Sequence, residues 1–346
     1  MAKSKVPLCA SVSVVIVNFN SAGYLASCVS SLLNPLYEEI ELVVVDNAST
    51  DGSVAKMSAA FPDVCVVRNR VNLGYAAAVN TGIALTKGEF IVIMNPDTLV
   101  EGRWLDPLLS AASRYPRGAF FQPKLLLMSD RQVLNSAGNM IHIAGFGLCR
   151  GIGTLDSRSF QPESEICFAS GACTFIRREA LREIGPVEEL FLAYGEDEDW
   201  GWRASMMGWQ SIYVPSSQIF HNWRPTLRPG KFHLLEFGRL LSVLKNYSGR
   251  TLLLLTPLLI LVESSVLLYA ARNGLLREKI QSYVSLILIR RDLSTRRQRV
   301  QEGRIVSDRI LMGKFVKQIQ HPYVGRRIRV VNRLVSSMWA VVANSI

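Results

Sequence analysis

In this 346-residue chain, Asp97 has a residue type and a setting that suit the binding of a metal ion. It follows the apolar run Phe90–Met94 after Asn95 and Pro96, and Pro96 ends strand pairing because it has no N–H to donate. A lone carboxylate with amide and hydroxyl neighbours suits a hard divalent cation held by oxygen ligands. Asn-Pro-Asp is also good turn chemistry, so a simple turn after a strand stays open here.

A second group is the run of four acidic residues, 196–199, in YGEDEDWGWR. Four adjacent carboxylates repel one another and are unexpected in a core. At least one pKa should therefore be raised, which is how a general base is tuned. The aromatic residues around the run favour a lined pocket: Phe191, Tyr194, Trp200, Trp202 and Trp209. The alternative is a solvated helix start, where acidic residues are favoured by the helix dipole.

Asp46 and His221 complete the candidate set. Asp46 ends the apolar run 40–46, where a carboxylate can accept a hydrogen bond from the ring N–H of a uracil or thymine. It can also simply cap its own turn. His221 follows a strand-like segment and is a metal-ligand candidate, although a single histidine is more often just packed or exposed.

Repeated strand–helix alternation positions these residues. The expected order is strand 12–18, helix 21–33, strand 40–46, helix from 53, strand 64–68, helix 75–85 and strand 90–94. This alternation predicts an α/β fold with a doubly wound, mostly parallel sheet and helices on both faces. The carboxyl ends of such strands share one edge, which brings Asp46 and Asp97 together. Neither a Gly-x-Gly-x-x-Gly motif nor a Walker lysine motif follows a strand, so a Rossmann dehydrogenase and a P-loop enzyme are both disfavoured.

The elements after residue 100 are less regular. We expect a helix at 102–115, a strand at 119–127, a glycine-rich mobile loop at 142–153, a helix at 179–184 and a strand at 210–214. The segment 166–177 is predicted to be one strand interrupted by Gly171, a glycine that would let a substrate approach the backbone.

Charge divides the chain into two parts. Residues 1–223 carry 17 basic and 22 acidic residues, a net charge of −5, whereas 224–346 carry 22 and 6, a net of +16. We therefore expect a domain at 1–225 and a basic, helical, membrane-associated region at 226–346. A tail of this charge favours nucleic acid or an anionic membrane as its partner. The six cysteines form no CxxC pair, and the first residues are too short for a signal peptide, which indicates a reducing compartment.

The basic part also contains two apolar segments. Residues 251–271 number 21, enough to cross a bilayer, which needs about 20. Glu263 lies in the middle, where a lone charge costs about 3 kcal/mol in a bilayer, so a helix against protein or in the membrane interface is favoured. Residues 323–345 place apolar residues on one helical face and begin with crowded arginines: Arg326, Arg327, Arg329 and Arg333. This predicts a basic interfacial helix, with an ordinary packed amphipathic helix as the alternative.

Together these motifs resemble the family 2 glycosyltransferases, which have the GT-A fold. The matching segments, in order, are VSVVIVNFN at 12–20, VVVDNASTDGS at 43–53, NLGYAAAVN at 72–80, NPDT at 95–98, GACTFIRREAL at 171–181 and YGEDEDWGWRASMMGW at 194–209. The resemblance covers about residues 12–225 and keeps the order and spacing of the motifs. Bacterial rhamnosyltransferase-type members, which extend polysaccharides on lipid carriers, are the more similar ones.

The resemblance implies roles for individual residues. The nucleotide of a dTDP- or UDP-sugar would contact Val17, Asn18, Phe19, Asp46, Asn72, Gly74 and Asn95, with Asp46 holding the pyrimidine ring. Asp97 would bind Mg²⁺ or Mn²⁺ at the diphosphate, and His221 would complete the metal site. Asp197 would be the catalytic base. The acceptor or the sugar would contact Gly171, Ala172, Glu196 and Trp200.

Two departures from the family pattern matter. Asn95 replaces the first Asp of the DXD pattern, which weakens the charge available to a metal. Trp200 stands where a smaller apolar residue is usual, so it would reshape the acceptor pocket.

The implied reaction is metal-dependent, inverting transfer of a sugar, with rhamnose as first choice and a UDP-hexose as alternative. The acceptor would be a hydroxyl of a glycan or lipid-linked glycan in cell-surface polysaccharide synthesis. The enzyme would be peripheral on the cytoplasmic face of the plasma membrane, with an anionic membrane surface and no nucleic acid as partner.

These residues also bear on two other functions. A sugar nucleotidyltransferase should show a glycine- and basic-rich loop after the first strand, but Asn18-Phe19-Asn20-Ser21 follows instead. A basic adaptor would not require Asp46, Asp97, Asp197 and His221 together. The sequence leaves the oligomeric state open.

Overall fold

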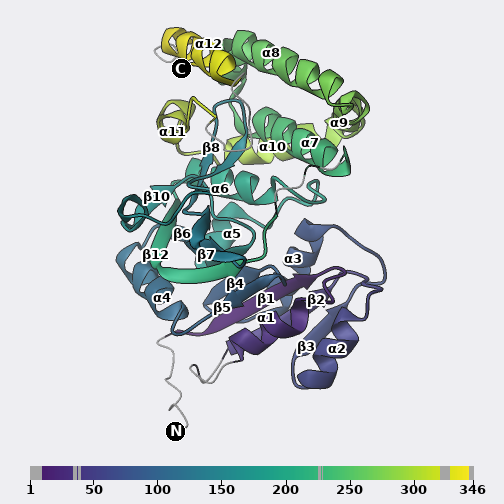
Figure 1. The fold of residues 1–346 in the computed structure, drawn as a ribbon. Coiled ribbons are helices and arrows are strands. Elements are labelled where there is room, and N and C mark those ends of the chain that lie inside the picture. The colour runs from purple at the N-terminus through teal and green to yellow at the C-terminus, as the bar shows by residue number, and fades with distance from the viewer. Residues whose placement is uncertain are drawn as a thin grey trace.

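A computed structural model describes residues 10–33, 37, 40–224, 227, 229–319 and 328–342 of the chain. A large sheet with helices on both faces forms one part of the molecule, and a layer of helices from the C-terminal third covers one end of it (Figure 1). The α/β class with helices on both faces and a helical C-terminal region, expected from the sequence, is confirmed. The boundary expected at 225/226 falls on residues outside the described part.

The first half of the sheet is parallel and follows the predicted alternation. Its elements are β1 (Val12–Asn18), α1 (Leu25–Leu32), β2 (Ile40–Asp46), α2 (Ser53–Ala60), β3 (Cys65–Arg68), α3 (Tyr75–Leu85) and β4 (Phe90–Met94). The strands pair in the order β4-β1-β2-β3. In this register Asn18 lies opposite Asp46, and both end their strands at the same edge.

The second half of the sheet is mixed. It contains β5 (Thr98–Val100), α4 (Leu105–Arg114), β6 (Gly118–Leu127), β7 (Asp130–Ser136), β10 (Ser164–Ile166), β11 (Cys173–Arg177), α5 (Arg178–Ile184), α6 (Glu196–Met206) and β12 (Gln210–His221). Strand β11 is antiparallel to both β4 and β6, and β12 continues the sheet beside β6. The single interrupted strand predicted at 166–177 is wrong, because β10 pairs with β12 while β11 lies between β4 and β6.

Alternate residues of the central strands face two separate cores. Val14 and Ile16 of β1 pack against α1, α2 and α4, whereas Val15 and Val17 pack against α3, α5 and α6. Helix α3 approaches the sheet closely, since a Cβ at Gly82 would lie 2.2 Å from a methyl group of Val15. The small residues of α3 therefore let its N-terminus come close to the sheet edge where the predicted site lies.

The mobile loop predicted at 142–153 is wrong. Strands β8 (Asn139–Ile141) and β9 (Gly147–Cys149) form an antiparallel hairpin here, followed by a short 3₁₀ turn, η1 (Arg158–Phe160). The buried Ile143 and Ala144 in its turn pack into a third core with α6 and the C-terminal helices. The glycines misled the interpretation because they serve close packing: a Cβ at Gly147 would lie 2.7 Å from a carboxylate oxygen of Glu198.

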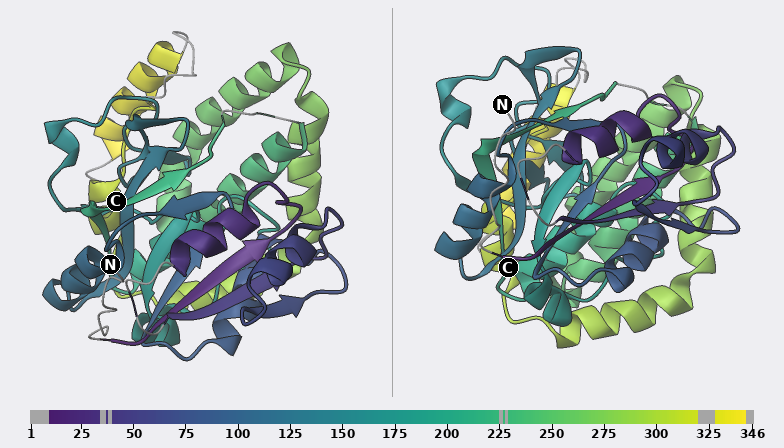
Figure 2. Two further views of the ribbon diagram at one scale, coloured as in Figure 1. Left: turned by 60° about the horizontal axis from the view of Figure 1, so that its bottom comes forward. Right: turned by 90° about the horizontal axis from the view of Figure 1, so that it is seen from below.

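The C-terminal third is helical. It consists of α7 (Pro229–Asn246), α8 (Gly249–Arg272), α9 (Leu276–Leu288), α10 (Arg290–Glu302), α11 (Asp308–Lys314) and α12 (Ile328–Val342). In Figure 1, α8 and α12 lie at the end of the molecule away from α2 and β3, and Figure 2 shows the C-terminal helices, in green to yellow, from two further sides. The helix predicted over 323–345 is present over 328–342, while Arg326 and Arg327 lie outside the described residues.

Candidate active site

A cleft of about 410 Å³ lies where the parallel strands end. Its walls come from the ends of β1 and β4, the start of α3 and the turn before α6. The lining residues are Val17, Phe19, Asn20, Ser21, Tyr24, Asn47, Asn72, Gly74, Tyr75, Asn95, Pro96, Asp97, Leu192 and Ala193. The cleft therefore contains Val17, Phe19, Asn72, Gly74 and most of the strand-end residues selected from the sequence, and we call it the donor cleft.

Asp46 and Asn18 lie at the edge of the donor cleft rather than in its lining. Both side chains are buried, and Asn18 Nδ2 donates to Asp46 Oδ1 at 3.0 Å and to Ser53 Oγ at 3.0 Å. The backbone N–H of Ser49 also reaches Asp46 Oδ1, at 3.4 Å. No described residue donates to Asp46 Oδ2, so this oxygen keeps its capacity to accept a hydrogen bond from a ligand.

Asn47 is a cleft residue that the sequence analysis missed. Its Nδ2 donates to Asn72 Oδ1 at 2.8 Å and to the Gly74 carbonyl at 3.0 Å, and its Oδ1 accepts from the Leu73 N–H at 3.0 Å. Gly74 has φ +87°, and a Cβ there would lie 2.9 Å from the Leu192 carbonyl, so glycine is required. The position directly after Asp46 at a strand end was the signal that could have identified Asn47.

Asp97 and His221 are 124 positions apart in sequence but lie in contact beside the donor cleft, which Asp97 lines. His221 Nε2 lies 3.4 Å from Asp97 Oδ1, because β12 ends at His221 beside β5, which follows Asp97 directly. Asn135 of β7, not singled out from the sequence, places its Oδ1 2.8 Å from His221 Nδ1. An amide oxygen only accepts, so Nδ1 is the donor to Asn135, and Nε2 is the ring nitrogen that faces the Asp97 carboxylate.

These two side chains fit a divalent cation whose other ligands come from the substrate. Among the described residues no group of three or more His, Cys, Asp or Glu side chains could hold a metal on its own. Mg²⁺ sites that serve phosphate chemistry commonly use one or two carboxylates together with substrate phosphates. The hydrogen bond from His221 Nδ1 to Asn135 is the orientation that metal-binding histidines usually receive from a neighbour.

Replacing Asn135 by alanine should loosen the metal-ligand pair. Without the acceptor for Nδ1, the imidazole loses both its fixed tautomer and its orientation, and such second partners typically contribute about 10- to 100-fold in metal affinity. We expect the Mn²⁺ affinity of Asn135→Ala, measured by electron paramagnetic resonance, to decrease by this factor. The Asn135→Asp variant keeps an acceptor oxygen and should keep the wild-type affinity. Equal Mn²⁺ affinity in Asn135→Ala and the wild type would contradict a supporting role for Asn135.

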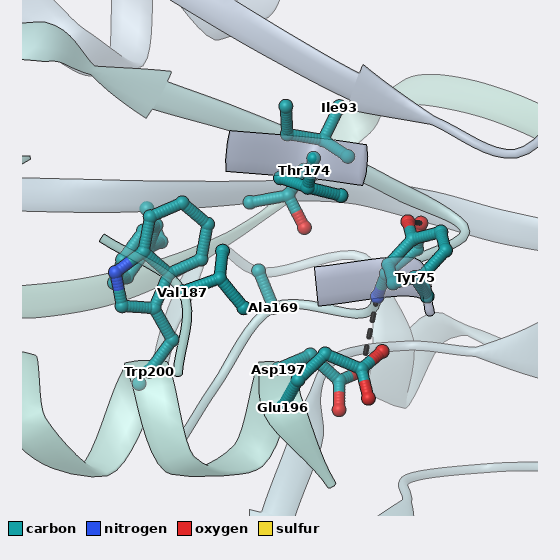
Figure 3. A pocket seen from close by; sticks show the side chains of 12 residues that line it. Tyr75, Ile93, Ala169, Thr174, Val187, Glu196, Asp197 and Trp200 are labelled. Atoms are coloured by element: carbon teal, nitrogen blue, oxygen red, sulfur yellow. Dashed lines mark hydrogen bonds between the residues drawn. The ribbon is translucent and has the colours of Figure 1, made fainter. Parts of the chain in front are cut away.

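The acidic run begins helix α6 beside a second, smaller cavity of about 20 Å³ (Figure 3). Asp197 Oδ2 accepts from the Gly171 N–H at 3.0 Å, and Asp197 Oδ1 accepts from the Glu198 N–H at 2.9 Å. Glu196 is buried and its Oε2 has no hydrogen-bond partner among the described residues. Tyr75 lines both this cavity and the donor cleft, so the carboxylates lie next to that cleft.

Burial separates the roles of the two carboxylates. Burial, and after it the charge of Asp197, raise the pKa of Glu196 to about 8. Burial also raises the pKa of Asp197, but the N–H donors of Gly171 and Glu198 oppose that shift by favouring the ionised form. The protonated form of Glu196 is therefore favoured at neutral pH, while the N–H donors of Gly171 and Glu198 favour the ionised form of Asp197. Like-charge repulsion, the cause expected from sequence, is secondary to burial.

Replacing Glu196 by glutamine should preserve activity at neutral pH. Glutamine has the shape of the protonated carboxyl, whereas wild-type Glu196 becomes charged as the pH rises through about 8 and then repels the charge on Asp197. The wild-type kcat/KM should change across this pH, and the Glu196→Gln variant should lose that transition. A variant that is inactive at every pH would instead assign the base to Glu196.

The other two acidic residues do not face the site. The expectation that this run avoids a core is wrong for Glu196, Glu198 and Asp199, which are all buried. Asp199 lies 2.9 Å from Arg203 Nε and 2.8 Å from Lys245 Nζ. Burial alone would raise the pKa of Asp199, but these two cations outweigh it and lower the pKa. Asp199 therefore joins α6 to α7 as a structural ion pair.

The aromatic residues around the run are mostly core residues. Trp209 packs in the second core and Trp202 in the third. Of these aromatic residues only Trp200 lines the small cavity, where its ring lies 4.9 Å from that of Phe120. Gly171 lies opposite the carboxylates: a Cβ there would be 3.7 Å from Asp197 Oδ2. Ala172 lines neither cavity, and its carbonyl accepts from the Asn95 N–H at 3.0 Å.

This arrangement of sheet and helices is a fold of the GT-A-like class. The fold is shared with a solved structure of GalNAc-T7 with UDP, GalNAc and Mn²⁺, at a TM-score of 0.58 and 16% identity, covering 83% of this chain and 57% of that one. The model of the family described as Glycosyl transferase family 2 matches residues 13–185. The chain therefore belongs to glycosyltransferase family 2 and transfers a sugar from a nucleotide sugar.

Two curated relatives from Mycobacterium tuberculosis (strain ATCC 25618 / H37Rv) are informative. An N-acetylglucosaminyl-diphospho-decaprenol L-rhamnosyltransferase is 31% identical over 231 residues, which cover 60% of this chain and 75% of the relative. A pre-mycofactocin glycosyltransferase is 29% identical over 224 residues, which cover 63% of this chain and 44% of that protein.

Proposed function

We propose that this enzyme is an inverting, metal-dependent glycosyltransferase that moves L-rhamnose to a hydroxyl of a lipid-linked glycan in cell-envelope polysaccharide synthesis. The observation that carries the reaction is that Tyr75 lines both the donor cleft and the cavity of Asp197. Asp97 lines the same donor cleft and is in contact with His221. The choice of rhamnose and of a lipid-linked acceptor rests on the L-rhamnosyltransferase at 31% identity. A glycan without a lipid carrier and a UDP-hexose donor are the alternatives.

The nucleotide end of the donor is held by the strand-end residues. The free Oδ2 of Asp46 accepts a hydrogen bond from the ring N–H of thymine or uracil, and the cleft residues Val17 and Phe19 flank the base. Asp97 and His221 would hold Mg²⁺ or Mn²⁺ beside the diphosphate, with Asn95 near them. When bound, such a cation neutralises charge on the departing diphosphate.

Asp197 then acts on the acceptor. Its carboxylate accepts the proton of the acceptor hydroxyl while that oxygen attacks the anomeric carbon from the face opposite the diphosphate. The bond from the anomeric carbon to the diphosphate oxygen breaks as the glycosidic bond forms, so a nucleoside diphosphate leaves and the configuration inverts. The N–H groups of Gly171 and Glu198 fix the two carboxylate oxygens in place during this step.

A panel of nucleotide sugars tests this function. The full chain is incubated with dTDP-L-rhamnose, UDP-glucose, UDP-N-acetylglucosamine and GDP-mannose, each with an isoprenyl-diphosphate-linked N-acetylglucosamine acceptor. We expect a glycosylated acceptor and dTDP from dTDP-L-rhamnose above all. Transfer only from a UDP-hexose would change the sugar and keep the mechanism. In a parallel incubation with dTTP or UTP and a sugar 1-phosphate, formation of a nucleotide sugar would instead indicate a nucleotidyltransferase.

We further propose that the enzyme attaches peripherally to the cytoplasmic face of the plasma membrane. Among the described residues one helix, α8, is long and apolar enough to cross a membrane, and only 22% of its apolar 18-residue stretch is buried inside the protein. Its Glu263 points inward, pairs with Arg239, lies 2.8 Å from Lys279 Nζ and accepts from Tyr283 at 2.7 Å. The outer face of α8 therefore carries no unpaired acidic charge, which favours interfacial contact with anionic lipid.

Three exposed apolar residues of α8 should carry much of this membrane binding. Leu253 is 74% exposed, and Ile260 and Leu268 are also exposed. Burying a leucine or isoleucine contributes about 1.5–3 kcal/mol, so the triple serine variant should bind anionic vesicles about 10²-fold more weakly or worse. Leu155, 64% exposed on the catalytic domain, gives a matched serine control.

Vesicle flotation and extraction separate the possible modes of attachment. We expect wild-type binding to phosphatidylglycerol vesicles that falls with salt, because basic residues near an anionic surface contribute about 1 kcal/mol each. Resistance to both high salt and alkaline carbonate would instead favour α8 as a span. Unchanged binding by the triple variant would exclude α8 as the contact, and binding to nucleic acid in place of vesicles would refute the membrane role.

A further inference from the structure

Tyr194 occupies an unusual position directly before the catalytic carboxylates. It precedes Gly195, the N-cap of α6, whose first two residues are Glu196 and Asp197. Its φ is +67°, a conformation that non-glycine residues rarely adopt, and its side chain is 42% exposed. Such backbone conformations persist only where surrounding structure enforces them, and they gather at functional sites.

Helix α7 enforces this turn. A Cβ at Gly238 of α7 would lie 2.8 Å from the Tyr194 carbonyl oxygen, so the backbone of α7 packs directly against the turn. Lys231, seven residues earlier on α7, places its Nζ 4.9 Å from the centre of the Tyr194 ring. This cation–π contact holds the ammonium group near the start of α6.

Lys231 is half-buried and lies within ion-pair distance of no carboxylate among the described residues. The other lysines of this region differ: Lys245 pairs with Glu188 and Asp199, and Lys279 pairs with Glu236 and Glu263. Partial burial lowers the pKa of Lys231, because it disfavours the charged ammonium form. An anionic partner would stabilise that form.

The position of Lys231 separates it from the donor cleft. Leu192 and Ala193 line that cleft, but neither Tyr194 nor Lys231 does. Tyr194 lies two residues before Glu196, so its contact with Lys231 places that ammonium group beside the start of α6 and outside the donor cleft. Lys231 is also on α7, the helix that leads into the apolar α8.

We propose that Lys231 binds a phosphate group of the acceptor, with Tyr194 positioning its ammonium group. The ligand class is a sugar carrying a phosphate or diphosphate at its anomeric carbon, placed so that a hydroxyl of the same sugar faces Asp197. This inference rests on the proposed function and adds to it the recognition of a charged acceptor. A diphosphate could also come from the donor, and the experiment separates the two sources.

The test compares a charged acceptor with a neutral one. The probes are N-acetylglucosaminyl diphosphate carrying a short isoprenyl chain and the neutral octyl glycoside of N-acetylglucosamine. Binding of each to the full chain is measured by calorimetry for the wild type, Lys231→Met and Lys231→Arg. Lys56→Met, at an exposed lysine of α2, is the matched control.

We expect Lys231→Met to weaken binding of the diphosphate probe by about tenfold or more, which is the usual contribution of a charge-assisted hydrogen bond. Lys231→Arg should recover most of this affinity, and Tyr194→Leu should lose part of it. Binding of the neutral probe and of the donor should not change, which also shows that the variants are folded.

Three results would overturn the inference: no binding of the diphosphate probe to the wild type, equal binding by Lys231→Met, or a loss confined to donor affinity, which would assign Lys231 to the donor diphosphate. Failure of the proposed function is distinguishable, because the wild type would then bind the diphosphate probe without transferring sugar to it from any donor.

Discussion

Replacing Asp197 by asparagine is expected to lower the transfer rate by about 10²- to 10⁴-fold, which is the usual contribution of a general base. The amide keeps the shape of the side chain and can still accept from the Gly171 N–H, but it cannot take a proton from the acceptor. Donor affinity should stay unchanged, because Asp197 does not line the donor cleft. Single-turnover kinetics together with donor titration separate these two quantities.

Glu196→Gln is the matched control for this variant, since it makes the same chemical change one residue earlier in the same cavity. We expect Glu196→Gln to be active at neutral pH where Asp197→Asn is not. Near-normal turnover by Asp197→Asn would refute its role as the base. Asp199→Asn is no substitute as a control, because it would leave Lys245 and Arg203 buried without their shared partner and should lower the stability of the fold.

Replacing Asp97 by alanine is expected to lower the transfer rate by about 10²-fold or more, since a metal ion stabilises the leaving charge by several kcal/mol. The wild type should lose activity in excess chelator and recover it with Mg²⁺ or Mn²⁺. Mn²⁺ binding measured by electron paramagnetic resonance in the presence of dTDP should be lost in the variant. Full wild-type activity in chelator would contradict a metal role and leave cationic side chains to stabilise the diphosphate.

Asn95→Asp provides the opposite change at the same site. Asn95 lines the donor cleft two residues before Asp97, and a second carboxylate there adds charge that a divalent cation favours. We expect this variant to bind Mn²⁺ more tightly than the wild type. Weaker binding would mean that the Asn95 side chain does not face the metal.

Most of the parallel half of the sheet was predictable because β1, β2 and β4 are largely buried on both faces. The mostly β-branched run Val12–Asn18 and the unbroken apolar run Phe90–Met94 match β1 and β4 residue for residue. Strands of this kind share one edge, so the proximity of Asp46 and Asp97 to one cleft followed from local patterns. The mixed half was harder, because the antiparallel insertion of β11 between β4 and β6 depends on pairings between distant segments.

The contacts around the catalytic residues could not be read from spacing. Asn135 reaches His221 across 86 positions, through the pairing of β7 with β6 and of β6 with β12. Asp199 is buried because Lys245, on a different helix, neutralises it. Glu263 was interpreted as a lone charge in an apolar segment, whereas Arg239 and Lys279 from two other helices pair with it. In each case a distant partner changes the energetic cost of a polar residue.

The anomeric configuration of the product is the most direct measurement of the proposed reaction. The full chain is incubated with Mg²⁺, dTDP-L-rhamnose and the diphosphate-linked N-acetylglucosamine acceptor, and the product is analysed by nuclear magnetic resonance. A single displacement aided by Asp197 predicts release of dTDP and a glycosidic bond of configuration opposite to that of the donor. A product that retains the donor configuration, or the release of dTMP in place of dTDP, would contradict it.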